Sequence, residues 1–327
     1  MVRRVLVVGT GSIGLRHARL LAERADVAVE VCDTRPDGLA EAARAVPGAR
    51  AWSSYEAALA SRPDIVVIAT PPTAHAPMTR AALAAGAYVF CEKPVSDTLA
   101  GARDMAEAAG RESGRGVNIG FVQRFMPELC RIRDQIRAGI IGQVCFARYS
   151  VGSLATLEFS RSRHQRDVFG AGALDYAYGF DTFWWILHQQ PAGVYARGAD
   201  APGLPLGSRP NVIAAVADYM APLVAEVHID YVARPERGSY FFQGDLGYLE
   251  FDTGRHVVRH GDRLSGQTSE ENFAYERDEI MRLQRDHFLE AAAGRHGVHT
   301  PVEDALPGAA AVDALIRSLR SGQREAV

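Results

Sequence analysis

Short, wholly apolar runs alternate with stretches of helical composition over the first third of the chain. Val5–Val8 and Ile65–Ala69 contain no polar residue, which is typical of strands buried on both faces of a parallel sheet. Residues of helical composition follow at Leu15–Ala22 and Thr73–Ala85. Further strands are expected at Val27–Cys32, Ala87–Cys91 and Val117–Phe121. This order predicts an α/β domain with a doubly wound parallel sheet and right-handed crossovers.

After about Arg124 the pattern changes to an alternation of apolar and polar residues. In Val224–Val232, three apolar residues (Val227, Ile229 and Tyr231) interleave with charged ones, so one face of the strand is packed and the other is wet. Similar strands are expected at Val144–Val151, Val212–Met220, Ser239–Gln243 and Tyr248–Phe251. The second half is therefore predicted to be an α+β domain whose open, mostly antiparallel sheet is covered by helices on one face.

The change of pattern places one domain at residues 1–123 and a second at residues 124–327. One helix, at about 173–188, is expected to interrupt the strands of the second domain. Near the end of the chain, Thr300–Glu303 resembles a capping box and predicts a final helix. Because Pro307 is disfavoured inside that helix, we expect a later start or a kink.

Composition excludes several classes of protein. A chain of 327 residues with 47% apolar and 23% charged residues is expected to form two globular domains. The net charge of −3 argues against a nucleic-acid partner, and the lack of a long apolar run or signal sequence argues against a membrane or secreted protein. Four scattered cysteines and no metal-ligand spacing predict neither a disulfide framework nor a metal site, which favours the cytoplasm.

A glycine-rich turn follows the first predicted strand and opens the first helix. Gly9 suits the tight turn, Gly11 leaves room for a pyrophosphate, and Gly14 lets the helix pack closely on the sheet. Asp33 ends the next strand nineteen residues later and can accept hydrogen bonds from both ribose hydroxyls. The carboxylate disfavours a 2′-phosphate and favours NAD over NADP, although Arg35 lies close enough to bind a phosphate. The helix amides that face the phosphates belong to Ser12 and Ile13.

Three further segments carry a resemblance to a known family. An Ala-Thr-Pro-Pro turn (Ala69–Pro72), Cys91-Glu92-Lys93-Pro94 and a Gly120–Pro127 segment occur in a chain with a Rossmann-type first domain and a second, antiparallel one. This combination resembles the Gfo/Idh/MocA family of glucose-fructose oxidoreductase and inositol dehydrogenase, and looks closest to dehydrogenases of sugars and nucleotide sugars. The resemblance implies an NAD(P) nicotinamide whose reactive carbon faces a pocket between the two domains. It also implies cofactor contacts by Thr70, Pro71, His75, Glu92 and Lys93.

Lys93 is the catalytic residue that the resemblance implies most directly. Its ammonium would bind the substrate hydroxyl and stabilise the alkoxide that develops as the hydroxyl is oxidised. The alternative for Lys93 is a solvated loop lysine, and the alternative for His75 is the start of its helix.

The second half of the site departs from the family pattern. After a glycine turn, family members carry an aspartate, a histidine that acts as acid and base, and another aspartate. Here Asp175, Tyr178 and Asp181 follow the turn, and aligning on either aspartate puts Tyr178 or Gly179 at the histidine position. Helical spacing places the three polar residues on one face. We predict that Tyr178 transfers the proton, although it can instead be a core aromatic.

Other expected substrate contacts are Arg124, which matches a family arginine, and His164, in the basic segment Arg161–Arg166, which can equally be a solvated loop. The function predicted is hydride transfer between NAD(P) and a ring hydroxyl or ketone of a sugar, nucleotide sugar or cyclitol. Two alternatives stay open, a cofactor-retaining elimination or epimerisation and a catalytically silent sensor or scaffold. A homodimer or homotetramer is expected to form through apolar residues on the open face of the sheet, namely Tyr219, Val227, Ile229, Tyr231 and Phe241.

Overall fold

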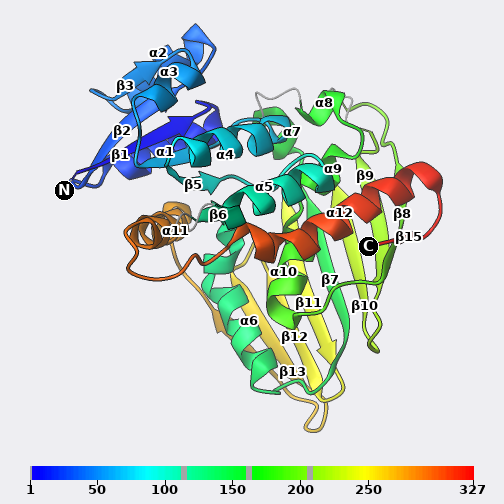
Figure 1. Ribbon diagram of the computed structural model, residues 1–327. Helices are drawn as coiled ribbons and strands as arrows, with labels where there is room; N and C mark the ends of the chain where they lie inside the picture. Colours follow the sequence, from blue (N-terminus) through cyan, green and yellow to red (C-terminus); the bar gives the residue numbers. More distant parts are fainter. Residues whose placement is uncertain (1, 112–115, 160–163, 205–208) are drawn as a thin grey trace. The chain divides into compact units, whose positions relative to one another are not determined.

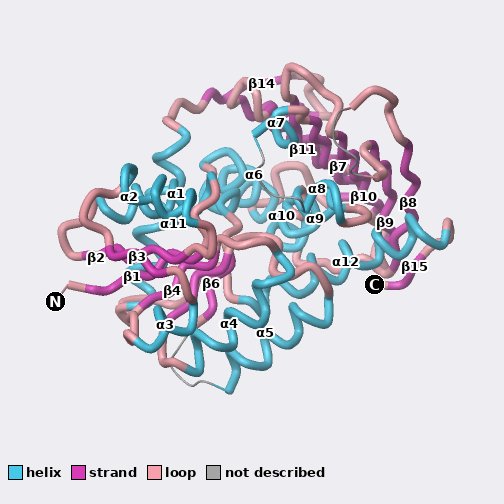
Figure 2. The backbone as a smooth tube through the Cα atoms, turned by 90° about the horizontal axis from the view of Figure 1, so that it is seen from above, coloured by secondary structure: helices cyan, strands magenta, loops and turns pink. Residues whose placement is uncertain are grey.

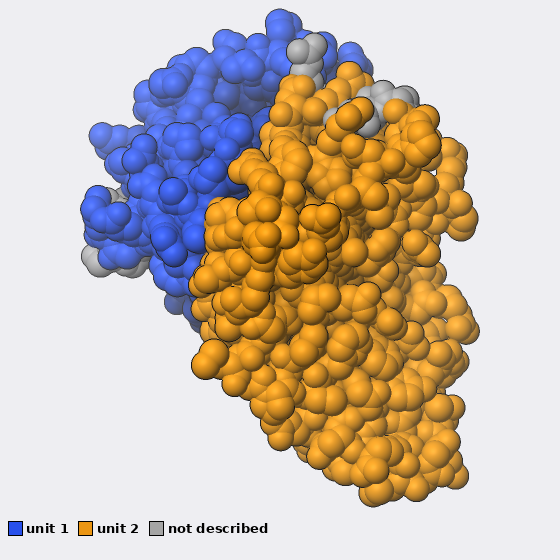
Figure 3. Space-filling model, turned by 90° about the vertical axis from the view of Figure 1, so that its right-hand side faces the viewer, with its two compact units in different colours: residues 1–121, 277–306 blue, residues 122–276, 307–327 orange. Residues whose placement is uncertain are grey.

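The computed structural model describes residues 2–111, 116–159, 164–204 and 209–327. The chain forms two compact units (Figure 3). Unit 1 contains residues 1–121 and 277–306, and unit 2 contains residues 122–276 and 307–327.

Unit 1 is built on a six-stranded parallel sheet with the order β3-β2-β1-β4-β5-β6. The strands are β1 (Arg3–Val8), β2 (Val27–Cys32), β3 (Arg50–Trp52), β4 (Ile65–Ile68), β5 (Tyr88–Cys91) and β6 (Val117–Ile119). The helices that connect them are α1 (Ser12–Ala22), α2 (Pro36–Ala45), α3 (Tyr55–Ala60), α4 (His75–Ala84) and α5 (Leu99–Arg111). Helices lie on both faces of the sheet, with α4 and α5 on the face opposite α1 (Figure 2). The predicted doubly wound sheet is confirmed, and its strand order reverses between β1 and β4.

Helix α11 (Arg277–Ala292) belongs to unit 1, although it lies late in the chain. Its Phe288 and Leu289 are fully buried, and the ring of Phe288 packs 4.7 Å from that of Phe90. The sequence division at 123/124 assigned this helix to the second domain, whereas the structure groups residues 277–306 with unit 1. An amphipathic pattern shows that a helix has an apolar face, but it does not show which sheet that face covers.

Unit 2 is built on a nine-stranded sheet with the order β14-β13-β12-β11-β7-β10-β9-β8-β15 (Figure 1). All neighbouring strands are antiparallel except β7 and β10, which are parallel. The strands are β7 (Val144–Gly152), β8 (Gly193–Ala199), β9 (Val212–Asp218), β10 (Val224–Asp230), β11 (Arg237–Gly244), β12 (Gly247–Asp252), β13 (Val257–Asp262), β14 (Thr268–Asn272) and β15 (Glu325–Ala326). The expected open, mostly antiparallel sheet is therefore confirmed.

Helices pack against one face of this sheet and form a single apolar core with it. They are α6 (Pro127–Arg137), α9 (Ala171–Asp175), α10 (Tyr178–Leu187) and the unit 2 part of α12 (Val302–Ser321). Two short helices, α7 (Ala155–Phe159) and α8 (His164–Asp167), precede α9. Helix α12 begins at Val302 and contains Pro307, so the expected later start is wrong.

The single helix expected at 173–188 is also wrong, because the chain leaves the helical conformation between Asp175 and Tyr178. Tyr176 has φ −108° and ψ 32°, which ends α9, and α10 then starts at Tyr178. Asp175, Tyr178 and Asp181 consequently do not share one helix face. Tyr176 and Ala177, which form the break, are both residue types that also occur within helices, so helical spacing did not predict it.

The apolar residues expected on the open face of the sheet lie mainly on its covered face. Val227, Ile229 and Tyr231 are at most 2% exposed, and Tyr219 is 9% exposed. Only Phe241 lies on the open face, where it is half-buried. The predicted alternation of apolar and polar residues along β10 is confirmed, but the apolar side chains face the helices and not the open face. Burying this apolar surface against the helices stabilises the fold.

Candidate active site

The glycine turn of unit 1 has the geometry expected for a phosphate-binding loop. Gly9 has φ +90°, and a Cβ atom there would lie 2.6 Å from the carbonyl oxygen of Ala69. A Cβ atom on Gly14 would lie 1.8 Å from the carbonyl oxygen of Gly9. At Gly11 no atom lies within 4 Å of the Cβ position, so the backbone there faces open space. This space adjoins the amino end of α1, where free amide groups attract anions, and the loop therefore fits a pyrophosphate.

Asp33 closes the turn from the end of β2. Its Oδ2 accepts hydrogen bonds from the backbone N–H of Thr10 at 2.8 Å and from the Thr10 hydroxyl at 2.7 Å. Its Oδ1 accepts the backbone N–H of Arg35 at 2.8 Å. Burial alone would raise the pKa of Asp33, but these hydrogen bonds hold it below its ordinary value. The Arg35 guanidinium lies 3.4 Å from both Asp33 and Asp37, so two carboxylates share its charge.

Thr70 and Pro71 follow β4, at the same carboxyl edge of the sheet as the glycine turn. His75 starts α4 and is 1% exposed. Its Nδ1 lies 2.8 Å from the carbonyl oxygen of Pro94, and its Nε2 lies 2.9 Å from that of Thr70. Burial lowers the pKa of His75. The imidazole therefore connects the turn after β4 to the turn after β5 from inside the unit.

The segment that follows β5 carries Glu92 and Lys93. The Glu92 carboxylate is buried, with Oε1 2.6 Å from Nε2 of His17, and its Oε2 accepts the backbone N–H of Lys93 at 3.2 Å. Lys93 itself is half-buried. His17 was not among the predicted site residues, because its place on α1 is that of any buried residue of the helix. One compositional signal does mark this turn, since Lys93 is the only lysine among the 36 basic residues of the chain.

In unit 2, the structure brings Arg124 and Asp181 together. Both side chains are at most 2% exposed, and the guanidinium and carboxylate meet through two contacts, Nε to Oδ2 at 3.0 Å and Nη2 to Oδ1 at 2.5 Å. The pair joins the 3₁₀ segment Val122–Phe125 to α10. A paired, forked geometry of this kind compensates the cost of burying two charges.

Asp175 lies in a separate polar cluster of unit 2. Its Oδ2 accepts hydrogen bonds from the Tyr231 hydroxyl at 2.5 Å and from Nε2 of Gln165 at 3.0 Å. Nε2 of His164 lies 3.9 Å from Oδ1. The structure thus unites the predicted residues His164 and Asp175 and adds Gln165 and Tyr231, which the sequence analysis missed.

Tyr178 is the first residue of α10, is half-buried and packs against the core of unit 2. The predicted shared helix face is wrong for Asp175, because the break after α9 separates Asp175 from Tyr178 and Asp181, which both lie on α10. The rest of the basic segment before His164, residues 161–163, lies outside the described residues.

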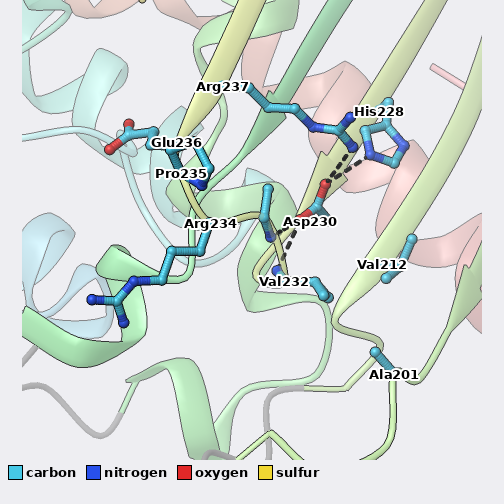
Figure 4. A pocket seen from close by; sticks show the side chains of 10 residues that line it. Ala201, Val212, His228, Asp230, Val232, Arg234, Pro235, Glu236 and Arg237 are labelled. Atoms are coloured by element: carbon cyan, nitrogen blue, oxygen red, sulfur yellow. Dashed lines mark hydrogen bonds and ion pairs between the residues drawn. The ribbon is translucent and has the colours of Figure 1, made fainter.

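An open hollow of about 570 Å³ lies at the end of β10 (Figure 4). The described residues that line it include none of the predicted site residues. Its buried acid is Asp230, toward which His228 and Arg237 point. The carboxylate also accepts two backbone N–H groups, and although burial would raise the pKa of Asp230, these partners hold it below its usual value. The Asp230 carboxylate is therefore already satisfied by two side chains and two backbone N–H groups.

Within the described ranges, no group of three or more His, Cys, Asp or Glu side chains could hold a metal ion. Helices in the same ranges are all too short or too polar to cross a membrane.

Comparison with known proteins agrees with this geometry. Residues 3–121 match the model of the Gfo/Idh/MocA family, described as an oxidoreductase family with an NAD-binding Rossmann fold. Inositol 2-dehydrogenase of Rhodococcus jostii is 29% identical over 99% of this chain and 92% of its own. D-glucoside 3-dehydrogenase of Escherichia coli is 33% identical over 43% of this chain and 41% of its own, and the rhizopine catabolism protein MocA of Rhizobium meliloti is 32% identical over 58% of each. The chain thus spans about half the length of several curated relatives.

Two solved structures show the same fold. GenD2 from gentamicin A biosynthesis, in complex with NAD, has a TM-score of 0.86 and 20% identity over 100% of this chain and 96% of its own. Scyllo-inositol dehydrogenase from Lactobacillus casei, with bound NAD(H) and scyllo-inositol, has a TM-score of 0.84 and 18% identity over 100% and 99%. With its glycine turn and Asp33, the segment of residues 3–121 is similar to the Gfo/Idh/MocA family of oxidoreductases with an NAD-binding Rossmann fold.

Proposed function

We propose that the protein is an NAD-dependent dehydrogenase or reductase that acts on a ring hydroxyl or ketone of a sugar, nucleotide sugar or cyclitol. The observation that carries the proposal is the position of Lys93. It follows β5 at the carboxyl edge of the sheet, the same edge at which the glycine turn and Thr70 lie. Ligands of doubly wound sheets bind at this edge. The cytosol is its proposed location, because its cysteines are free thiols.

The nature of the basic group at this position supports the proposal. The chain has arginine at every basic position except position 93. An ammonium is a compact point charge that can approach one oxygen atom, whereas a guanidinium is a broad, planar fork. Lysine at position 93 is therefore the side chain suited to bind one hydroxyl and stabilise the alkoxide that develops on it.

Binding of the cofactor's phosphates and adenosine ribose is assigned to groups distinct from Lys93. The amides of the glycine turn would hold the pyrophosphate, and Asp33 would accept hydrogen bonds from the adenosine ribose. Bound NAD supplies the hydride acceptor for the oxidation. For the proton we propose Tyr178, with the His164–Asp175 pair as the second candidate.

The function is tested by incubation with NAD and a panel that contains inositols, methyl glucosides and UDP-sugars, followed by absorbance of the reduced nicotinamide. Net NADH formation is the expected result. Product formation without net NADH would instead support the cofactor-retaining elimination or epimerisation. Tight NAD binding with no turnover of any panel member would support the silent sensor or scaffold.

We expect NAD to bind more tightly than NADP by about 1–3 kcal/mol, roughly 5- to 150-fold. The Asp33 carboxylate would face the 2′-phosphate of NADP, while Asp33 and Asp37 already share the charge of Arg35. Calorimetric dissociation constants for the two oxidised cofactors measure the difference. Equal affinities, or tighter NADP binding, would show that Arg35 determines the specificity at the adenosine end.

We also expect a homodimer or homotetramer that buries the open face of the unit 2 sheet. Phe241 lies there within 6.2 Å of Phe146 and 5.5 Å of Tyr248, measured between ring centres, and Val216 is 47% exposed on the same face. Light scattering should give at least twice the chain mass of 35.4 kDa. Val216→Arg should lower that mass by placing a charge in the interface. A wild-type mass near that of one chain at micromolar concentration would contradict the expectation.

A further inference from the structure

The turn that carries Lys93 is held by a buried hydrogen bond from α1. His17, 2% exposed, points its Nε2 at Oε1 of Glu92 over 2.6 Å, and Glu92 is 8% exposed. The other carboxylate oxygen of Glu92 accepts the backbone N–H of Lys93 at 3.2 Å. One carboxylate therefore joins the imidazole on α1 to the main chain of the only lysine.

The surroundings leave the Glu92 carboxylate little freedom. A Cβ atom on Gly120 would lie 3.0 Å from its Oε2, so any side chain at position 120 would crowd the carboxylate. The ring of Phe90 packs edge-on against His17, with 5.2 Å between ring centres. On the far side of Lys93, the carbonyl oxygen of Pro94 lies 2.8 Å from Nδ1 of His75. Both ends of the three-residue turn are thus tied to buried imidazoles.

Helix α1 links the contact between His17 and Glu92 to the cofactor-binding turn. It begins at the glycine turn, whose amides fit a pyrophosphate, and His17 lies on the same helix. A rigid helix that contacts both the cofactor phosphates and the Lys93 turn would fix the ammonium relative to the cofactor. Holding reacting groups in such a fixed geometry is a major source of catalytic rate.

We propose that His17, acting through Glu92, is a positioning residue that sets the place of the Lys93 ammonium. This inference rests on the proposed function of Lys93. His17→Leu removes the imidazole and keeps an apolar side chain, and should lower kcat at least 10-fold while NAD affinity changes only a few-fold. His17→Gln places an amide N–H near the position of Nε2 and should restore most of the rate. Leu21→Ala, which removes a fully buried apolar side chain on the same helix, is the control for lost stability.

A double-variant cycle, assayed with NAD and the panel member that is turned over, separates positioning from a merely structural role. If His17 acts through Lys93, adding His17→Leu to Lys93→Ala should cause little further loss of turnover. Losses that multiply would overturn the proposal. A Lys93→Ala enzyme with normal turnover would instead contradict the proposed function. The positioning inference can also be tested without measuring turnover.

That test uses the fact that Lys93 is the only lysine. Reductive methylation with ¹³C-formaldehyde labels its amine and the α-amino group of the chain, so the methyl spectrum contains a single lysine signal. In folded His17→Leu and Glu92→Gln proteins, checked by circular dichroism, this signal should move toward that of a free lysine and sharpen. In His17→Gln it should stay near the wild-type position. An unchanged signal in His17→Leu would overturn the inference without any substrate being present.

Discussion

Replacing Lys93 with alanine should lower turnover at least about 100-fold while the dissociation constant of NAD changes only a few-fold. Under the proposed function, the ammonium would act on the reacting oxygen, whereas the glycine turn and Asp33 would hold the phosphates and ribose through separate groups. The measurements are kcat and KM for a turned-over polyol, together with a calorimetric dissociation constant for NAD.

Lys93→Arg tests whether the compact shape of the ammonium, and not only its positive charge, is needed for turnover. It keeps the positive charge but replaces a compact ammonium with a planar guanidinium, so we expect it to lose most of the activity as well. Arg80→Ala, a basic position on the exposed face of α4, removes one positive charge elsewhere in unit 1 and should retain wild-type kinetics. Normal turnover at saturation combined with weak NAD binding in Lys93→Ala would assign Lys93 to the cofactor and remove it from the chemistry.

The buried strands and the glycine turn were predicted well because each depends on residues close together in the sequence or on the adjacent strand. Val5–Val8 of β1 and all four residues of β4 are apolar because both faces of the sheet are buried there, and that pattern has few alternative explanations. Gly9 and Gly14 are required by a positive φ angle and by a close backbone approach, both of which involve the turn itself and the strand beside it. Local constraints of this kind are visible in a single sequence.

The break between α9 and α10 depends on distant residues and was missed for that reason. Tyr176 leaves the helix so that its hydroxyl can meet that of Thr156 at 2.7 Å and its ring can pack 5.9 Å from that of Tyr231. Just beyond it, Gly179 approaches β7 so closely that a Cβ atom would lie 2.4 Å from the ring of Tyr149. None of these partners is adjacent in sequence, so helical spacing alone predicted a continuous helix.

The polar contacts of the site were missed for a related reason. Asp175 was predicted as a site residue from its place in a motif, but its partners Tyr231 and Gln165 come from the end of a strand and from a short helix. The charged hairpin strand β14 is exposed at every residue and has no apolar alternation to predict it. Side-chain partnerships and solvent-exposed edge strands are determined by tertiary structure, which the pattern of one chain does not encode directly.

Replacing Tyr178 with phenylalanine should abolish most turnover and leave the free energy of unfolding almost unchanged. The substitution keeps the ring that packs against the unit 2 core and removes only the hydroxyl. A free phenol, with a pKa of about 10, is a weak base at neutral pH. Tyr178 begins α10, and the positive end of a helix dipole favours a negatively charged group. Turnover and thermal unfolding of the same preparation measure both parts of the prediction.

Tyr176→Phe is the matched control. Tyr176 is also a half-buried tyrosine, and its hydroxyl contacts that of Thr156, so removing this hydroxyl should leave turnover near the wild-type value. If Tyr178→Phe keeps the wild-type rate, Tyr178 is a core aromatic and the proton must pass through another group. His164→Asn is then the decisive variant, because His164 lies 3.9 Å from an Asp175 carboxylate that already accepts hydrogen bonds from Tyr231 and Gln165. An imidazole can accept a proton from a hydroxyl and return it in the reverse reaction, and this is the role that the variant would test.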